Sequence, residues 1–354
     1  MSEPLFLKSL NIHGFRAFDQ LSIDRLGRVN LIVGKNNVGK SSLLEALWLY
    51  ACQGHPVIAW KILEARDEGR GPERTPQIRL PNTEDEGRDY TSAIKQLFYR
   101  EGQNRQAQPA QIGPIGDEQR ILTLALSQTS DQKNGAVIPA FKTQLGGQKN
   151  TYRLDGVSYP LQEGRNEECI VVTANGLDSR AVENFWDKVA LTSLEDDVLN
   201  ALRLIAPDVE KVNLLAGRKH RTGRIPVVKV VGVTEPVPLK SLGEGMNRMF
   251  GIALALVNAK DGVLLIDEIE SGLHYSVQPD VWLLVFEVAR RLNIQVFATT
   301  HSWDCLIAFQ EAARKYEQDE GVLIRLTQKE RRIVADLFDE EDLVIVAREG
   351  IEVR

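Results

Sequence analysis

The amino-acid sequence predicts an α/β fold in which a mixed central sheet is flanked by helices. Two apolar runs carry this prediction, because each ends abruptly at a polar turn: Val29–Val33 stops at Gly34, and Val263–Ile266 stops at Asp267. The first turn leads directly into Ser42–Tyr50, where apolar residues recur at helical spacing. A buried strand, a tight turn and a helix in this order are typical of a parallel α/β sheet.

Composition limits the class of protein further. The chain has 354 residues, of which 43% are hydrophobic and 26% charged, enough for a large core or two lobes. A net charge of -6 does not favour nucleic-acid binding by the whole surface, although a local basic patch could still bind it. Three scattered cysteines form neither a disulfide framework nor a metal-binding spacing, which indicates a reducing compartment. Neither a signal peptide nor an apolar run of roughly 18–20 residues is present, so we expect a cytoplasmic protein without membrane contact.

Residues 1–173 are expected to form a first, β-rich lobe. Leu5–Ile12 and Leu21–Ile23 have the pattern of a strand pair. Between about residues 55 and 117 the chain is rich in Arg, Glu, Gln, Gly and Pro, which predicts an excursion of polar loops with one helix near residues 90–99. Further strands are expected at 121–126, 151–154 and 169–173.

The remaining chain is expected to complete the same head in two parts. Residues 174–240 predict a helical lobe, from the periodicity of 179–205, followed by a β hairpin that includes 227–231. Residues 241–354 alternate between the two element types: helices are expected at 246–258, 278–292 and 310–316, and strands at 263–266, 294–298, 322–326 and 343–347. No internal repeat and no sustained heptad pattern is present.

The turn after the first apolar run is a complete phosphate-binding loop (P-loop), Gly34–Ser41. Its glycines let backbone N–H groups approach phosphate oxygens closely. Lys40 would reach the β- and γ-phosphates, and the Ser41 hydroxyl would ligate Mg²⁺. A chance glycine turn is the alternative, but the flanking strand and helix argue against it. The predicted nucleotide-binding residues of this segment are Gly34, Asn36, Asn37, Gly39, Lys40, Ser41 and Ser42.

Two acidic residues and a histidine follow neighbouring apolar runs. Asp267 would hold Mg²⁺, and Glu268 would orient and polarise an attacking water. A solvated acidic turn is the alternative for this pair. His301 follows Ala298–Thr300 at the same predicted sheet edge, where it could hydrogen-bond a γ-phosphate. Glu268, Lys40 and His301 are therefore the candidate catalytic residues.

Two further segments are candidate anion sites. Ser241–Gly245 is a glycine-rich turn before a predicted helix, and a helix N-terminus offers free N–H groups to an anion. An ordinary helix N-cap is the alternative interpretation. Gly217–Arg224 is the densest basic run and could contact DNA phosphates, but we favour a solvated hairpin tip.

In their order, these motifs resemble those of an ABC-type ATPase head. The early P-loop and the long segment before the signature Ser241–Met246 resemble the RecF/SMC branch rather than a transporter cassette. The long coiled coil of SMC proteins is missing. The resemblance is strongest to the OLD-like group (overcoming-lysogenization-defect ATPases), through Gly34–Ser42, the signature, Ile266–His274 and Thr300–Ser302.

The resemblance implies an ABC-type P-loop NTPase head that pairs with a second copy across ATP and Mg²⁺. The P-loop of one copy would face Ser241 and Gly243 of the other, with Gly245 in the same signature. Arg16 would lie near the base, and the loop after Cys169–Thr173 would replace the Q-loop, with Asn175 or Asp178 in place of glutamine.

Besides the missing Q-loop glutamine, the sequence departs from the family pattern in two ways that affect function. Leu242 stands where the ABC signature has serine, and Ser241 comes one place earlier. OLD proteins carry a Toprim nuclease domain after the ATPase, whereas about fifty residues follow His301 here, too few for a domain of usual size.

The leading hypothesis is a homodimer that hydrolyses ATP and regulates a separately encoded partner, a Toprim-like nuclease or another DNA-processing protein. The family resemblance implies a role in phage defence, and DNA is a possible further ligand. A stand-alone RecF-like repair ATPase and a non-catalytic, nucleotide-dependent scaffold are the alternatives.

Overall fold

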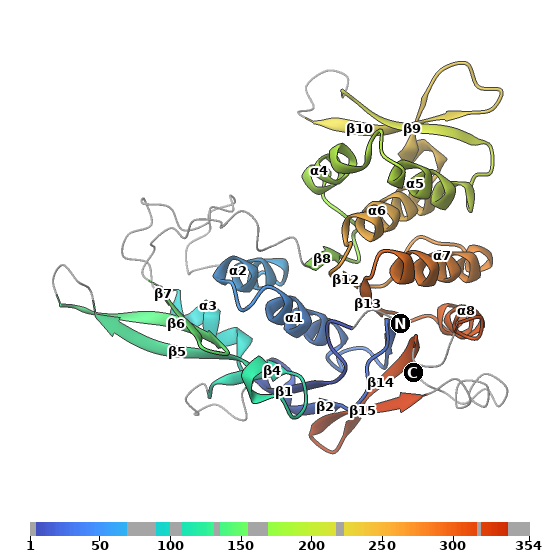
Figure 1. The fold of residues 1–354 in the computed structure, drawn as a ribbon. Coiled ribbons are helices and arrows are strands. Elements are labelled where there is room, and N and C mark those ends of the chain that lie inside the picture. The colour runs from blue at the N-terminus through green and yellow to red at the C-terminus, as the bar shows by residue number, and fades with distance from the viewer. Residues whose placement is uncertain are drawn as a thin grey trace.

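The computed structural model describes residues 5–68, 90–99, 108–130, 135–154, 169–216, 223–316 and 320–338. These residues form two six-stranded sheets and one three-stranded sheet (Figure 1). The expected α/β fold with a mixed central sheet is confirmed. In the described ranges, no helix is long and apolar enough to cross a membrane.

The central sheet has the strand order β15-β14-β3-β13-β12-β8. All neighbours are parallel except the edge pair β14–β15. The carboxyl ends of β3, β12 and β13 therefore meet at one sheet edge, where α/β proteins bind ligands. The strands are β3 (Val29–Val33), β8 (Cys169–Val172), β12 (Val263–Ile266), β13 (Gln295–Thr299), β14 (Gly321–Lys329) and β15 (Arg332–Phe338).

Helices cover both faces of this sheet, and alternating strand residues supply the two cores. Leu31 and Leu264 belong to the core with α6 (Glu244–Asn258), α7 (Gln278–Arg291) and α8 (Trp303–Ala313). Their neighbours in sequence, Ile32 and Leu265, belong to the core with α1 (Lys40–Ala51) and α2 (Pro56–Ala65). Burial on both faces explains why β3 and β12 are continuous apolar runs.

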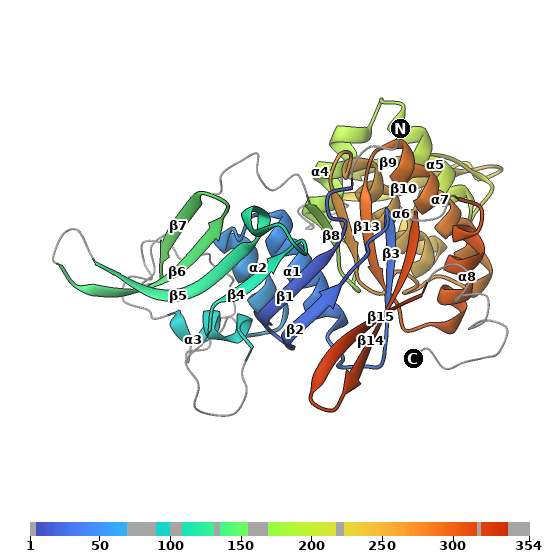
Figure 2. The same cartoon turned by 60° about the horizontal axis from the view of Figure 1, so that its bottom comes forward.

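The second sheet is antiparallel, in the order β2-β1-β4-β5-β6-β7, and its outer strands extend away from the central sheet (Figure 2). Short helical segments at Thr91–Ile94 (α3) and Lys95–Leu97 lie beside it. Its strands are β1 (Leu10–Phe15), β2 (Phe18–Ile23), β4 (Ala110–Gly113), β5 (Leu122–Ser130), β6 (Val137–Leu145) and β7 (Gln148–Arg153).

The third sheet covers two helices that pack on α6 (Figure 1). The helices are α4 (Ser179–Val189) and α5 (Leu194–Arg203), and the strands are β9 (Val209–Ala216), β10 (Arg224–Val230) and β11 (Val237–Pro238). The division of the chain near residues 173 and 240 stays a prediction.

Several predicted elements differ from the structure. The stretch 179–205 forms two helices because the chain turns at Leu191, which has a φ of 66°. Helix α2 lies in the expected polar excursion, where its buried residues Val57, Ile58, Ile62 and Leu63 recur at helical spacing. The helix near 90–99 is only α3 with a 3-10 turn. The first strand starts at Leu10 rather than Leu5. The predicted strand 343–347 and the basic residues 217–222 lie outside the described residues.

Gly34, where β3 meets the P-loop, accepts no larger residue without movement. It has a φ of 143°, and a Cβ there would lie 2.4 Å from the carbonyl oxygen of Leu326 in β14. We expect Gly34→Ala to lower the free energy of unfolding by about 1–3 kcal/mol, as overpacking does. Urea unfolding measures this. Gly147→Ala, whose Cβ would meet nothing within 4 Å, is the control and should change little; equal stabilities would contradict the prediction.

Candidate nucleotide-binding and catalytic site

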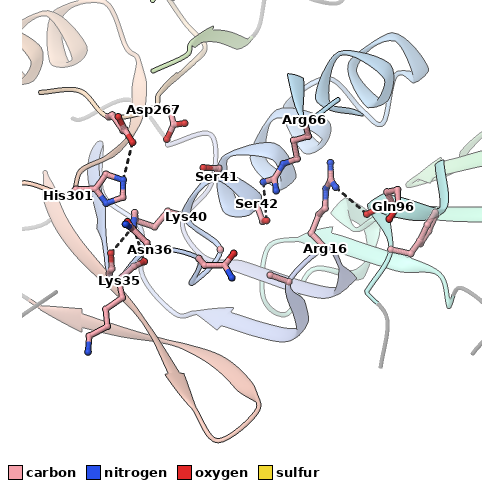
Figure 3. Close-up of a pocket in the computed structure, with 16 residues that line it drawn as sticks. Arg16, Lys35, Asn36, Lys40, Ser41, Ser42, Arg66, Gln96, Asp267 and His301 are labelled. Carbon is pink, nitrogen blue, oxygen red and sulfur yellow. Dashed lines mark hydrogen bonds and ion pairs between the residues drawn. The ribbon is translucent and has the colours of Figure 1, made fainter. Parts of the chain in front are cut away.

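A cavity of about 1030 Å³ opens at the carboxyl edge of the central sheet. Figure 3 shows Asp267 and His301 at one end of it, Arg16, Arg66 and Gln96 at the other, and Lys40 between them. The structure thus brings together most of the predicted site residues from four separate segments of chain. The lining residues are Arg16, Ala17, Gly34, Lys35, Asn36, Asn37, Gly39, Lys40, Ser41, Ser42, Arg66, Gln96, Phe98, Asp267, Glu268 and His301.

The P-loop presents main-chain N–H groups and one buried cation to this cavity. Gly39, with a φ of 90°, is the N-cap of α1, and no side chain caps the helix. The first N–H groups of α1 therefore stay available for an anion. Lys40 Nζ is buried and donates to the carbonyl oxygens of Gly34 (2.7 Å) and Lys35 (3.0 Å). Burial lowers the pKa of Lys40, opposed by the nearby carboxylates of Asp267, Glu268 and Glu270.

The end of β12 is held in register by Thr299, the last residue of β13. The Thr299 hydroxyl donates to Asp267 Oδ1 at 2.6 Å and accepts from the Glu268 N–H at 2.9 Å. One hydroxyl thereby fixes both the carboxylate of Asp267 and the backbone of Glu268. Glu268 adopts a φ of 49°, a conformation that is strained for a residue with a Cβ and occurs often at functional sites.

His301 lies against Glu268. Its Nε2 is 3.0 Å from Glu268 Oε1, and its main-chain N–H donates to Glu270 Oε1 at 2.9 Å. Both side chains are about two-fifths exposed, His301 at 40% and Glu268 at 39%. Glu268 and His301 therefore face the cavity as an exposed, hydrogen-bonded pair that a water molecule or a phosphate could reach.

The opposite end of the cavity is basic and was only partly predicted. Arg16, in the turn between β1 and β2, pairs with Glu45 (3.1 Å) and donates to the Gln96 carbonyl (3.3 Å). Arg66 pairs with the same Glu45 (2.6 Å) and donates to Ser42 Oγ (3.4 Å). Burial raises the pKa of Glu45, and the two guanidinium groups oppose this shift. Arg16 also pairs with Glu68, so this wall of the cavity carries two guanidinium groups that are held by two carboxylates.

The carboxylate of Asp267 and the hydroxyl of Ser41 both line the cavity, and they form a donor set that suits Mg²⁺ bound together with phosphates. Magnesium is usually held by one or two protein oxygens, with phosphate and water completing its shell. No group of three or more His, Cys, Asp or Glu residues able to hold a metal occurs within the described residues, so an all-protein metal site is not offered there.

The signature residues do not join this cavity. Ser241 and Gly243 are exposed at the start of α6, and neither they nor Gly245 line it. Asn175 and Asp178, the candidates for the Q-loop position, do not line it either, and Asp178 instead accepts from the Ala181 N–H as the N-cap of α4. The roles of these residues stay predictions.

Sequence reasoning missed four residues that shape the site: Arg66, Gln96, Arg248 and Thr299. Thr299 could have been found, because it ends an apolar strand beside the Asp-Glu strand. Arg66 and Gln96 could not, because they come from segments that had no motif. Arg248, on α6, is buried, and its guanidinium donates to the carbonyl oxygens of Thr173 (2.6 Å), Asp267 (2.7 Å) and Glu268 (2.8 Å).

Comparisons with known proteins agree with this fold. Residues 6–61 match a family model described as "AAA ATPase domain", and residues 198–308 match one described as "AAA domain, putative AbiEii toxin, Type IV TA system". An "ATP/GTP phosphatase" of Helicobacter pylori is 24% identical over 95% of this chain and 96% of its own length. A DNA replication and repair protein RecF of Exiguobacterium is 31% identical over 20% of this chain and 21% of its own.

Solved structures are similar in fold. An Smc head bound to the C-winged helix domain of ScpA superposes with a TM-score of 0.54 at 12% identity, covering 96% of this chain and 99% of that one. An Smc head domain with an extended coiled coil from Pyrococcus furiosus, bound to the C-terminal domain of ScpA, gives 0.52 at 10% identity over 98% and 99%.

The fold is the α/β fold of the solved Smc heads, and residues 6–61, which contain the P-loop, match a model of an AAA ATPase domain. Together with the similarity to the phosphatase over nearly the whole chain, these findings fit an ABC-type ATPase of the RecF/SMC branch.

Proposed function

We propose that this head binds ATP with Mg²⁺ and hydrolyses it. The observation that carries the proposal is a single cavity with Lys40 and the P-loop N–H groups on one wall and the Glu268–His301 pair on another. Binding and water activation would then occur a few side chains apart.

The chain's own residues would divide the work. The first N–H groups of α1 and Lys40 would hold the triphosphate, while Asp267 and Ser41 would hold Mg²⁺, which supplies charge neutralisation when it is bound. Glu268 would orient the attacking water and take up its proton. Thr299 would keep the two acidic residues in place. Arg16 and Arg66 would face the part of the nucleotide nearer the ribose, because they lie at the end of the cavity away from Asp267 (Figure 3).

We propose further that two copies pair across ATP. Gly243 is the N-cap of the 15-residue helix α6, no side chain caps it, and a Cβ there would meet nothing within 4 Å, so the turn is exposed. Leu242 beside it is a large apolar side chain that is 38% exposed, and Tyr275, three residues after the Gly272 that Gly245 contacts, is 62% exposed. A second P-loop with its bound phosphates would supply the anion and would cover these side chains.

The experiment that tests hydrolysis is phosphate release by the wild-type chain with MgATP, repeated in EDTA. We expect turnover with Mg²⁺ and loss of turnover without it. If the wild-type chain released phosphate no faster than the Lys40→Ala variant at any protein concentration, the proposal would be overturned.

His301→Ala tests the role of the histidine. Because its ring contacts Glu268 and faces the cavity, we expect kcat to fall on the order of 100- to 1000-fold, as loss of one polar transition-state contact does, with little change in ATP affinity. Steady-state kinetics with a binding titration measure both. His13→Ala, on β1 away from the cavity lining, is the control. An unchanged kcat in His301→Ala would remove the histidine from the mechanism.

We propose that ATP turnover regulates a separate DNA-processing partner. The OLD resemblance implies that this partner is a Toprim-like nuclease and that the biological role is phage defence. Support comes from two similarities: the RecF relatives are DNA replication and repair proteins, and one matched family is described as a putative toxin of a toxin–antitoxin system. A stand-alone RecF-like activity is the second candidate. DNA that accelerates phosphate release by the purified chain alone would favour that candidate, whereas acceleration only with the partner would favour regulation.

A further inference from the structure

The start of α6 is bound to the acidic end of β12 by one buried arginine. Arg248 is 6% exposed, and its guanidinium spans three main-chain carbonyl oxygens: Thr173 after β8, and Asp267 and Glu268 after β12. All three distances lie between 2.6 and 2.8 Å, typical of strong, charge-assisted hydrogen bonds. The arginine therefore joins two neighbouring strand ends to the signature helix.

These contacts bear on the conformation of Glu268. With a φ of 49°, its backbone needs support to remain in the left-handed region. Thr299 holds the N–H of Glu268, and Arg248 holds its carbonyl oxygen and that of Asp267. The direction of the Glu268 side chain toward His301 follows from this backbone, so the position of Arg248 affects where the carboxylate lies.

A second contact ties the signature turn to the same loop. A Cβ on Gly245 would lie 2.7 Å from the carbonyl oxygen of Gly272, so the first turn of α6 packs directly against the backbone after β12. Arg248 is one helical turn further along α6. The segment from Asp267 to Gly272 is thus fixed to α6 at both ends.

The charges around Arg248 suit this role. Burial lowers the pKa of its guanidinium, whereas Glu270, Asp267 and Glu268 raise it. Because the ordinary pKa of an arginine lies far above neutral, the group stays cationic at neutral pH. A neutral side chain of the same length could not donate to three carbonyl oxygens.

We infer that Arg248 is a positioning residue that couples the Ser241–Gly245 turn to Glu268. When that turn meets the nucleotide of a second copy, the contact is passed through α6 to the Glu268 of this chain's own site. Each chain would then hydrolyse its ATP efficiently only while its signature engages the other. The inference rests on the proposed ATP-bridged dimer.

The first test separates binding from turnover in Arg248→Lys and Arg248→Met. We expect ATP affinity within about threefold of wild type, kcat lowered on the order of 10-fold or more in the methionine variant, and partial recovery in lysine, which keeps the charge but makes fewer bonds. Arg28→Lys, which alters an equally buried arginine that does not line the cavity, is the control. An unchanged kcat in Arg248→Met would overturn the inference. So would a joint loss of affinity and kcat that is no larger than the loss in Arg28→Lys.

The second test isolates one active site in a mixed dimer. A Ser241→Arg copy keeps its own P-loop, and a Lys40→Ala copy supplies an intact signature. Neither forms an active pair with itself, so phosphate release reports the mixed pair. Lys40→Ala protein is titrated into Ser241→Arg protein until the rate reaches a plateau.

The plateau rate differs according to whether the site is coupled to its own chain's signature or independent of it. Coupling predicts a rate per active site several-fold below wild type, because the signature of the active copy is not engaged, and adding Arg248→Lys to that copy should change it little. A plateau equal to the wild-type rate per site would overturn the coupling. Absence of turnover in the wild-type chain would instead overturn the proposed function, so the two failures are distinguishable.

Discussion

Glu268→Gln is expected to stop ATP turnover while ATP binding is retained. Glutamine keeps the size and the hydrogen bond to His301 but cannot take a proton from water. We expect kcat to fall by about 100-fold or more, since general-base catalysis contributes roughly 10²- to 10⁴-fold. Single-turnover phosphate release and nucleotide affinity measured on one preparation give both quantities.

Glu311→Gln is the matched control for this substitution. It makes the same chemical change on an exposed position of α8, away from the cavity lining. It should turn over ATP at the wild-type rate. If Glu268→Gln hydrolysed ATP as fast as Glu311→Gln, Glu268 would not be the base, and the mechanism would have to be assigned to another residue.

Lys40→Ala is expected to weaken ATP binding on the order of 10- to 100-fold. The Lys40 ammonium is buried at the base of the P-loop, and a hydrogen bond to a charged group contributes about 1.5–3 kcal/mol. Without it, the phosphates would keep the N–H groups of α1 and the Mg²⁺ that Asp267 and Ser41 would hold. Isothermal titration with ATP and with ADP measures the change.

Lys61→Ala removes the same charge from an exposed position of α2 and controls for net charge. Its affinity should match wild type. Equal affinities of the Lys40 and Lys61 variants for ATP would show that the triphosphate does not bind where the P-loop and Lys40 predict.

The sequence was sufficient for the parts of the site that depend on local pattern. Val29–Val33 and Val263–Ile266 are apolar throughout because both faces of the parallel sheet are covered, and such runs can be recognised without a structure. The glycines of the P-loop and the Asp-Glu pair follow those runs directly. Because parallel strands end at a common edge, Lys40, Asp267 and His301 could be expected to meet, and they line one cavity.

The parts that depend on long-range contacts could not be predicted. Arg66 reaches the cavity only because α2 folds back beside α1. The helical spacing of the apolar residues in α2 is hidden in the sequence by the polar residues around that helix. Arg248 occupies an ordinary helix position, and its three carbonyl partners come from residues 19 to 75 positions away in sequence. The break at Leu191 lies within a continuous helical pattern, where local propensity gives no stop signal.

We propose that ATP joins two copies of this head, and the mass in solution of Glu268→Gln, measured by sedimentation with and without MgATP, tests this. One chain has a mass of 39.6 kDa, and we expect about twice this value with ATP and a single chain without it. Ser241→Arg in the same background should bind ATP yet stay a single chain, because its exposed signature turn is blocked. A Glu268→Gln protein that binds ATP at saturation and remains at the mass of one chain would contradict the account.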